Sequence, residues 1–236
     1  MSEKASNNFE NGIFWELYSD LERQFQNFLE YVPYLPRNET VYSFKLLNLI
    51  ITIGGHIDSA FKEMARYPQF SRKDGCIEIL KRAKEKKGII STGVKAFDEI
   101  YGISTKKVKF KPQVEREDVF PFRCDRKENK LPQWWKFHTD LKHDVGINIK
   151  EASLKNARDA LAGAFLLNVR HIPSGVRLYE HGVLKTGYIE WRIVAGGLHP
   201  DPFNPESVRK ILEKKEIESP FFVETPVFIY KYNQEY

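Results

Sequence analysis

The first part of the chain carries apolar residues at the spacing of one helix face. Steps of three and four separate the members of this stripe, which are Phe14, Tyr18, Leu21, Phe25, Phe28 and Val32. The pattern predicts an amphipathic helix that ends before Pro33. A second helical pattern predicts a central helix from about Glu39 to Arg66. Its Gly54-Gly55 pair favours either close approach of a neighbouring backbone or a kink.

Two more helices are predicted in the second half of the chain. Gln133–Lys142 follows a proline and keeps helical spacing. Ala152–Val169 combines leucines with many small residues, which suits close packing between helices. Shorter patterns predict a basic helix at 74–87 and another helix at 91–101, and Asn204-Pro205-Glu206 has the residues that begin a helix.

Strand patterns are short and lie in the middle and the tail. Val108 and Phe110 alternate with lysines, as in an edge strand, and residues 118–131 have the composition of a loop. Apolar alternation predicts a strand at 188–194 and a last strand over Phe221–Tyr232. Proline in that last segment either confines it to a sheet edge or splits it.

These elements predict a mainly α fold, an antiparallel helical bundle with a basic insertion and a small α+β C-terminal tail. The bundle should span residues 12–171 and should be interrupted by the insertion at 71–131. Residues 172–236 should form the α+β C-terminal extension.

Positive charge is concentrated in the insertion. The net charge of the chain is +5, but residues 72–130 alone hold 17 Lys or Arg against 10 Asp or Glu. Within this zone, Lys81, Arg82 and Lys84 could follow a phosphate backbone, or could simply be an exposed helix face. The two cysteines form no disulfide framework, and we find neither a signal peptide nor a membrane span. We therefore expect a cytoplasmic protein with no membrane partner.

The densest chemical cluster is the segment from Trp134 to Asp144, which holds two tryptophans and two histidines. On a helix, Lys136 and His143 project from nearly one face, and Asp140 lies close enough to orient the imidazole. A histidine can transfer protons near neutral pH, and a nearby cation can stabilise charge on a phosphate. This arrangement suits metal-independent cleavage of a phosphodiester, with Lys142 as a further phosphate contact.

Ordinary packing is the competing interpretation of the same segment. Trp134, Phe137 and Leu141 are spaced as a core stripe, and His143 would be favoured as a cation at the helix C-terminus. His56 has a similar alternative, because a histidine in an apolar helix is commonly a core residue. Phosphate-binding glycine loops, nucleophile elbows and metal-ligand spacings are missing from the sequence, so we expect no cofactor and no metal.

The segment PQWWKFHTDLKHDVGINIKEASLKNARDALAGAFLL, residues 132–167, resembles the HEPN superfamily of all-helical proteins of prokaryotic defence and RNA processing. The helix around residues 56–62 is similar to the long helix that packs against this segment in such proteins. The resemblance covers about 90 residues in two blocks. It implies a helical domain that acts on or binds RNA.

Active members of that superfamily carry an arginine four to six residues before a histidine, and cut RNA through its own 2′-hydroxyl without metal. His143 takes the histidine position, and Lys136 or His138 takes the arginine position. Lysine keeps the positive charge but lacks the two-pronged phosphate contact of arginine. The resemblance thus implies His143, Lys136 and Asp140 as catalytic residues, and Lys142 and His138 as RNA contacts.

Two functional hypotheses follow. In the first, the chain binds RNA or cleaves it as an endoribonuclease that needs no metal. In the second, the same helices form a non-catalytic module for protein interaction. In both cases we expect a homodimer, the commonest symmetric assembly.

Overall fold

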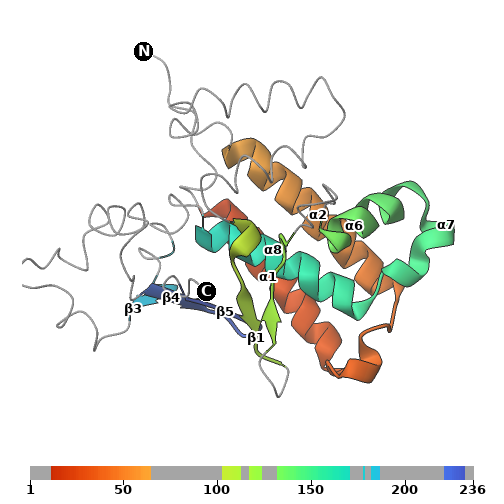
Figure 1. Ribbon diagram of the computed structural model, residues 1–236, viewed down its shortest axis with the longest axis horizontal. Coiled ribbons are helices and arrows are strands. Elements are labelled where there is room, and N and C mark those ends of the chain that lie inside the picture. The colour runs from red at the N-terminus through yellow and green to blue at the C-terminus, as the bar shows by residue number, and fades with distance from the viewer. Residues whose placement is uncertain are drawn as a thin grey trace, which may run out of the picture.

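The computed structural model describes residues 12–64, 103–112, 117–123, 132–170, 178, 182–186 and 221–231. This part is mainly helical and contains one small antiparallel sheet, which confirms the predicted fold class (Figure 1). The helices predicted at 74–87, 91–101 and from Asn204, and the strand predicted at 188–194, lie outside the described residues.

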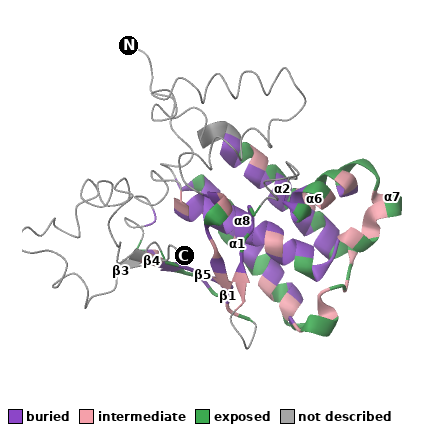
Figure 2. Ribbon diagram, in the orientation of Figure 1, coloured by how far each residue is buried: buried purple, intermediate pink, exposed green. Residues whose placement is uncertain are grey.

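Helix α8 (Leu154–Arg170) is the centre of the helical part. It packs against α1 (Ile13–Leu29), α2 (Phe44–Met64) and α6 (Gln133–His143). Fourteen of its seventeen residues are buried, and Figure 2 shows the helix almost wholly purple. Its small residues permit this, since a Cβ on Gly163 would lie 3.0 Å from Cζ2 of Trp134.

Helix α1 was predicted correctly from its apolar stripe. All the stripe residues from Phe14 to Phe28 are buried in the helix, and Val32 is half-buried just beyond it. The ring centroids of Tyr18 and Phe165 lie 5.5 Å apart, so this stripe contacts α8 directly. The burial of large rings on one face is what holds α1 on the bundle.

Helix α2 begins later than its sequence pattern indicated, at Phe44 instead of about Glu39. The backbone before it bonds to the segment that leads into α8. The Leu154 N–H donates to the Val41 carbonyl over 2.9 Å, and the Lys155 N–H donates to the Glu39 carbonyl over 3.1 Å. The Ser43 hydroxyl then accepts from the Leu46 N–H, which caps the helix.

Short helical segments connect the main ones. They are η1 (Pro36–Asn38), η2 (Ile103–Thr105), α7 (Val145–Asn148) and η3 (Ile149–Glu151). The Asp144 side chain accepts a hydrogen bond from the Ile147 N–H and so caps α7. This cap turns the chain sharply after α6 and carries it through η3 to α8.

One antiparallel sheet gathers five strands from distant parts of the chain. The strand order is β2-β1-β5-β4-β3. The strands are β1 (Val108–Phe110), β2 (Asp118–Val119), β3 (Leu184–Thr186), β4 (Phe221–Glu224) and β5 (Phe228–Lys231). The basic insertion and the C-terminal segment therefore share a sheet, in which β1 pairs with β5.

Two details of the predicted strands are corrected. β1 was expected at a sheet edge but lies between β2 and β5, and the expected loop at 118–131 begins with β2. A single sequence cannot show that the lysine-bearing strand finds partners on both sides. The predicted last strand is split at Pro226 into β4 and β5, which confirms one of its two alternatives.

A buried carboxylate joins the β4–β5 hairpin to α1. Oε1 of Glu22 accepts hydrogen bonds from the Tyr18 hydroxyl over 2.8 Å, from the Thr225 hydroxyl, and from the Val227 N–H over 3.3 Å. Glu22 is only 5% exposed. Burial raises the pKa of its carboxyl, and these hydrogen bonds oppose the rise only in part.

Glu22→Gln tests this connection by keeping the accepting oxygen and removing the charge. A raised folded pKa means that the carboxyl favours folding at low pH and loses this contribution as the pH rises through that pKa. The variant should therefore gain stability over the parent at about pH 8 and lose this gain near pH 4. Urea unfolding of the parent and the variant at both pH values measures these differences in stability. An effect equal at the two pH values would contradict the charge argument.

Glu22→Ala is the companion variant. It leaves the Tyr18 and Thr225 hydroxyls and the Val227 N–H without their acceptor. We expect a loss of about 3 kcal/mol in the free energy of unfolding near pH 4, and a smaller loss at pH 8, where the charged carboxylate already stabilises the parent less.

Helices α2 and α6 approach through Gly54. A Cβ built on Gly54 would lie 2.2 Å from Cδ2 and Nε2 of His138, whereas one on Gly55 would meet nothing within 4 Å. Gly54 thus leaves room for the His138 side chain of α6. The sequence had suggested that a neighbouring backbone approaches there or that the helix is kinked. The two neighbouring glycines form a natural matched pair.

Gly54→Ala should lower the free energy of unfolding by about 2 kcal/mol, because the methyl group overlaps the His138 ring. Gly55→Ala should raise it by about 0.5 kcal/mol, because alanine is the better helix former and the site is open. Thermal and urea unfolding compare the two. Equal shifts would show that the ring is not fixed there.

Candidate nucleic-acid interface

One face of α6 is fixed in the core. The indole N–H of Trp134 donates to the Pro121 carbonyl over 2.6 Å, and Trp134, Trp135 and Leu141 are all buried. The rings of Trp134 and Trp135 meet edge to face, with centroids 5.4 Å apart. These contacts set the rotation of the helix, and therefore which residues it presents to solvent.

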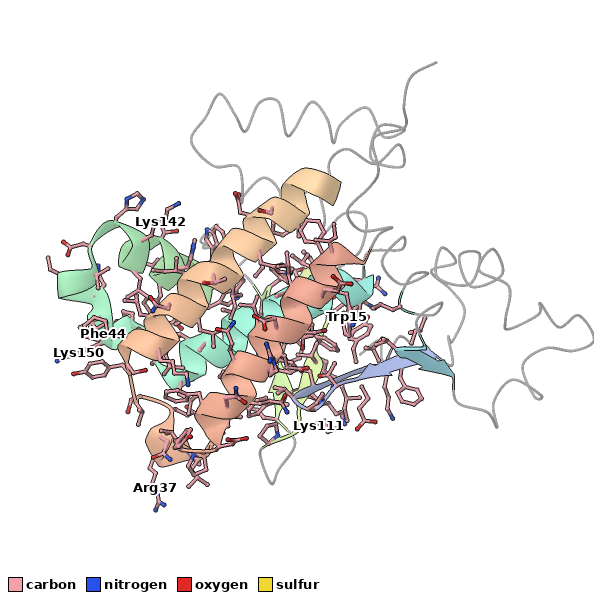
Figure 3. The ribbon with its side chains drawn as sticks, turned by 180° about the vertical axis from the view of Figure 1, so that it is seen from behind. Trp15, Arg37, Phe44, Lys111, Lys142 and Lys150 are labelled. Atoms are coloured by element: carbon pink, nitrogen blue, oxygen red, sulfur yellow. The ribbon has the colours of Figure 1, made fainter. Side chains whose placement is uncertain are left out.

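The opposite face of α6 is polar and open. Lys136 and His143 are exposed on this face, and Asp140 is half-buried. Lys142 is also exposed, but it comes one turn after the buried His138 and so projects from the side of α6 nearer the core. Lys136 and His143 are two turns apart, as the helical spacing predicted. The structure therefore places two of the three catalytic candidates, Lys136 and His143, at the surface. Figure 3 shows Lys142 pointing outward from α6.

Asp140 does not orient His143 in this structure. No hydrogen bond or ion pair joins the two side chains, both of which lie in the described part of the chain. The Asp140 carbonyl instead accepts from the Asn148 side chain over 3.3 Å and from the Asp144 N–H over 2.9 Å. Asp140 thus helps to end the helix through its backbone, and its carboxylate is left at the surface.

His138 lies inside the protein, although it was expected to contact RNA. It is 7% exposed, and its ring centroid lies 4.8 Å from that of Trp135. Burial lowers its pKa, as does the Lys142 cation, whereas the Asp58 carboxylate raises it. His138 is buried because α2 has no side chain at Gly54, and the imidazole ring fills the space left there. A ring so placed cannot reach a strand in solvent.

The other side chains expected to contact RNA belong to the basic run of the insertion. Lys81, Arg82 and Lys84 lie outside the described residues.

His56 is a core residue, which favours the packing interpretation of its sequence position. Nε2 lies 3.4 Å from the Asn168 amide nitrogen, and the ring meets Phe14 edge-on at 5.5 Å. The amide also donates to the Ala164 carbonyl, so the contact with His56 requires an unprotonated Nε2. Nδ1 has no hydrogen-bond partner among the residues that the structure describes. Burial lowers the pKa of His56 to about 4.

Sequence reasoning missed the buried ion cluster around Arg158. This side chain is 3% exposed and pairs with Glu117 across the fold and with its neighbour Asp159. Its guanidinium also lies over the rings of Tyr34 at 5.1 Å and Phe110 at 5.7 Å. The cluster therefore fastens β1 and the loop after α1 to α8.

A signal for this residue was present in the sequence. Arg158 comes four residues after Leu154 and three before Leu161, so it falls on the buried stripe of α8. Glu22 has the same relation to Tyr18 and Phe25 on α1. A charged residue at a core position indicates a buried partner.

Searches with family models, among curated proteins and among solved structures find no match to this chain. In the described part of the chain, no helix is both long enough and apolar enough to cross a membrane.

His56→Gln tests the buried histidine. The pKa of His56 falls from 6.5 to about 4 on folding, so its contribution to stability is complete above pH 6.5 and is lost as the pH falls toward 4. This loss should total about 3 kcal/mol. Glutamine does not titrate, so the variant should lose less stability over this range. Chemical unfolding at a series of pH values gives the slope of the unfolding free energy against pH for the parent and for the variant. Identical slopes would refute the lowered pKa of His56.

Proposed function

We propose that the chain is a HEPN-like RNA-binding protein whose RNA contact includes the exposed side of α6. The exposure of Lys136, Lys142 and His143 on one helix supports this most directly. Buried tryptophans hold the core side of the helix. The cations therefore project from a rigid support, which reduces the entropy lost on binding.

The same side chains supply the groups for cleavage without metal. In this scheme the His143 imidazole takes the proton of the RNA 2′-hydroxyl as that oxygen bonds to the adjacent phosphorus. The bond from phosphorus to the 5′-oxygen breaks, which leaves a 2′,3′-cyclic phosphate, and water protonates the departing 5′-oxygen. Lys136 and Lys142 stabilise the charge that develops on the phosphate. Lysine at the arginine position binds phosphate as a point charge, so we expect slower cleavage than a bidentate contact would give.

The binding proposal is tested with a Lys136→Ala/Lys142→Ala double variant and labelled single-stranded RNA. Removal of each lysine–phosphate interaction should reduce the slope of log affinity against log salt by about 0.7. The double variant should therefore bind more weakly and with a shallower salt dependence. Lys231→Ala, an exposed lysine on β5, is the matched control and should bind as the parent does. Equal affinities in the double variant and the parent would refute the surface.

The catalytic proposal is tested with His143→Ala in excess chelator. Cleavage by the parent that disappears in this variant, with RNA affinity preserved, supports His143 as the proton-transfer group. Cleavage that persists at the parental rate excludes that role. RNA that is bound but left intact by the parent leaves a binding protein without catalysis.

A further inference from the structure

The end of the bundle next to α7 exposes large apolar side chains. Phe44 is 71% exposed, Tyr42 is 47% exposed and Ile147 is 80% exposed. Backbone contacts fix their neighbourhood, since the Ser43 N–H donates to the Ala152 carbonyl and Tyr42 pairs with Ser153. Residues 42–44 thus lie against the segment that follows α7 and η3. Figure 3 places the labels of Phe44 and Lys150 at this end.

The exposed charged residues in the segments around these rings are mostly lysines. In residues 42–45 and 142–150, the exposed charged side chains are Lys45, Lys142, Lys150 and Asp144. Three lysines against one aspartate leave an excess of two positive charges. The Asp144 carboxylate is already engaged by the Ile147 N–H. The surface therefore combines open aromatic rings with amines, the combination that binds bases and phosphates of an unpaired strand.

We infer that Tyr42 and Phe44 stack on unpaired bases of RNA whose phosphates contact Lys45 and Lys150. This inference rests on the proposed RNA binding by α6 and extends that surface around the end of the bundle. Tyr42, Phe44, Lys45 and Lys150 are called the stacking face below. A base-paired helix keeps its bases stacked on one another, so the stacking face selects single-stranded RNA.

Charge favours RNA over a second copy of the chain as the occupant. Two copies meeting through this face would bring Lys45 and Lys150 toward the same residues of the other copy, and like charges in a desolvated contact are costly. A phosphate backbone is complementary to the same lysines. The two rings are separated by one residue, so both can meet one strand.

The test uses the full chain with Tyr42→Ala/Phe44→Ala, and Phe44→Ala alone as the variant that leaves the Tyr42 bridge intact. Affinity is measured by fluorescence anisotropy for a single-stranded RNA, for an abasic oligonucleotide of equal length, and for duplex RNA. The double variant should bind the single strand about tenfold more weakly. Its affinity for the abasic strand should be unchanged, and Phe44→Trp, which keeps a ring at this position, should bind the single strand as tightly as the parent does.

Phe120→Ala is the control, because Phe120 is 37% exposed after β2 and has Arg123 over its ring. It should bind as the parent does. An equal weakening for the abasic and ordinary strands, or unchanged affinity in the double variant, would overturn the stacking face.

Two outcomes separate this inference from the proposed function. If the Lys136/Lys142 variant loses RNA affinity and the aromatic variants do not, the stacking face is refuted and RNA binding by α6 stands. If the parent binds no RNA, both fail. Two further arms identify other occupants. The inference is also refuted if the aromatic variants keep their RNA affinity but no longer bind anionic phospholipid vesicles, which would indicate a lipid surface. It is refuted likewise if they keep their RNA affinity but no longer form a concentration-dependent dimer, which would indicate a second copy of the chain.

Discussion

The burial of α8 is the constraint on which the rest of the structure depends. A helix enclosed by three other helices and a sheet needs small residues where neighbours approach, and Gly163 against Trp134 shows how little space remains. Phe165 of α8 stacks on Phe228 of β5 with centroids 5.6 Å apart, so one helix supports both the bundle and the sheet. Because α6 packs on α8, its buried tryptophans determine which of its side chains reach solvent.

Buried charge connects parts of the fold that are far apart in sequence. Glu22 of α1 holds the β4–β5 hairpin, and Arg158 of α8 joins Glu117, Tyr34 and Phe110. Apolar contacts alone are tolerant of small shifts, whereas hydrogen-bonded ions in a core have a definite geometry. These two clusters therefore define where the sheet sits on the helices.

The proposed RNA surface follows from this framework. The core holds one side of α6, and the cations on its other side project without being buried by a described neighbour. Asp144 ends α6 and caps α7, which carries the exposed surface toward Phe44 at the start of α2. The helix face and the stacking face are thus adjacent parts of one end of the bundle, joined by short connections and supported by the same core.

The helical class and the buried side of α1 could be predicted from the sequence, because helical periodicity is a local property. The start of α2, the inner position of β1 and the pairing of β1 with β5 could not, because they depend on hydrogen bonds between distant segments. The candidate site divides in the same way. The spacing of Lys136 and His143 predicted a shared helix face. Only tertiary packing decided that His138 is buried against Gly54 and that His143 is exposed. Arg158 and Glu22 could be flagged as charges on core stripes, yet their partners come from segments that a helical pattern cannot bring together.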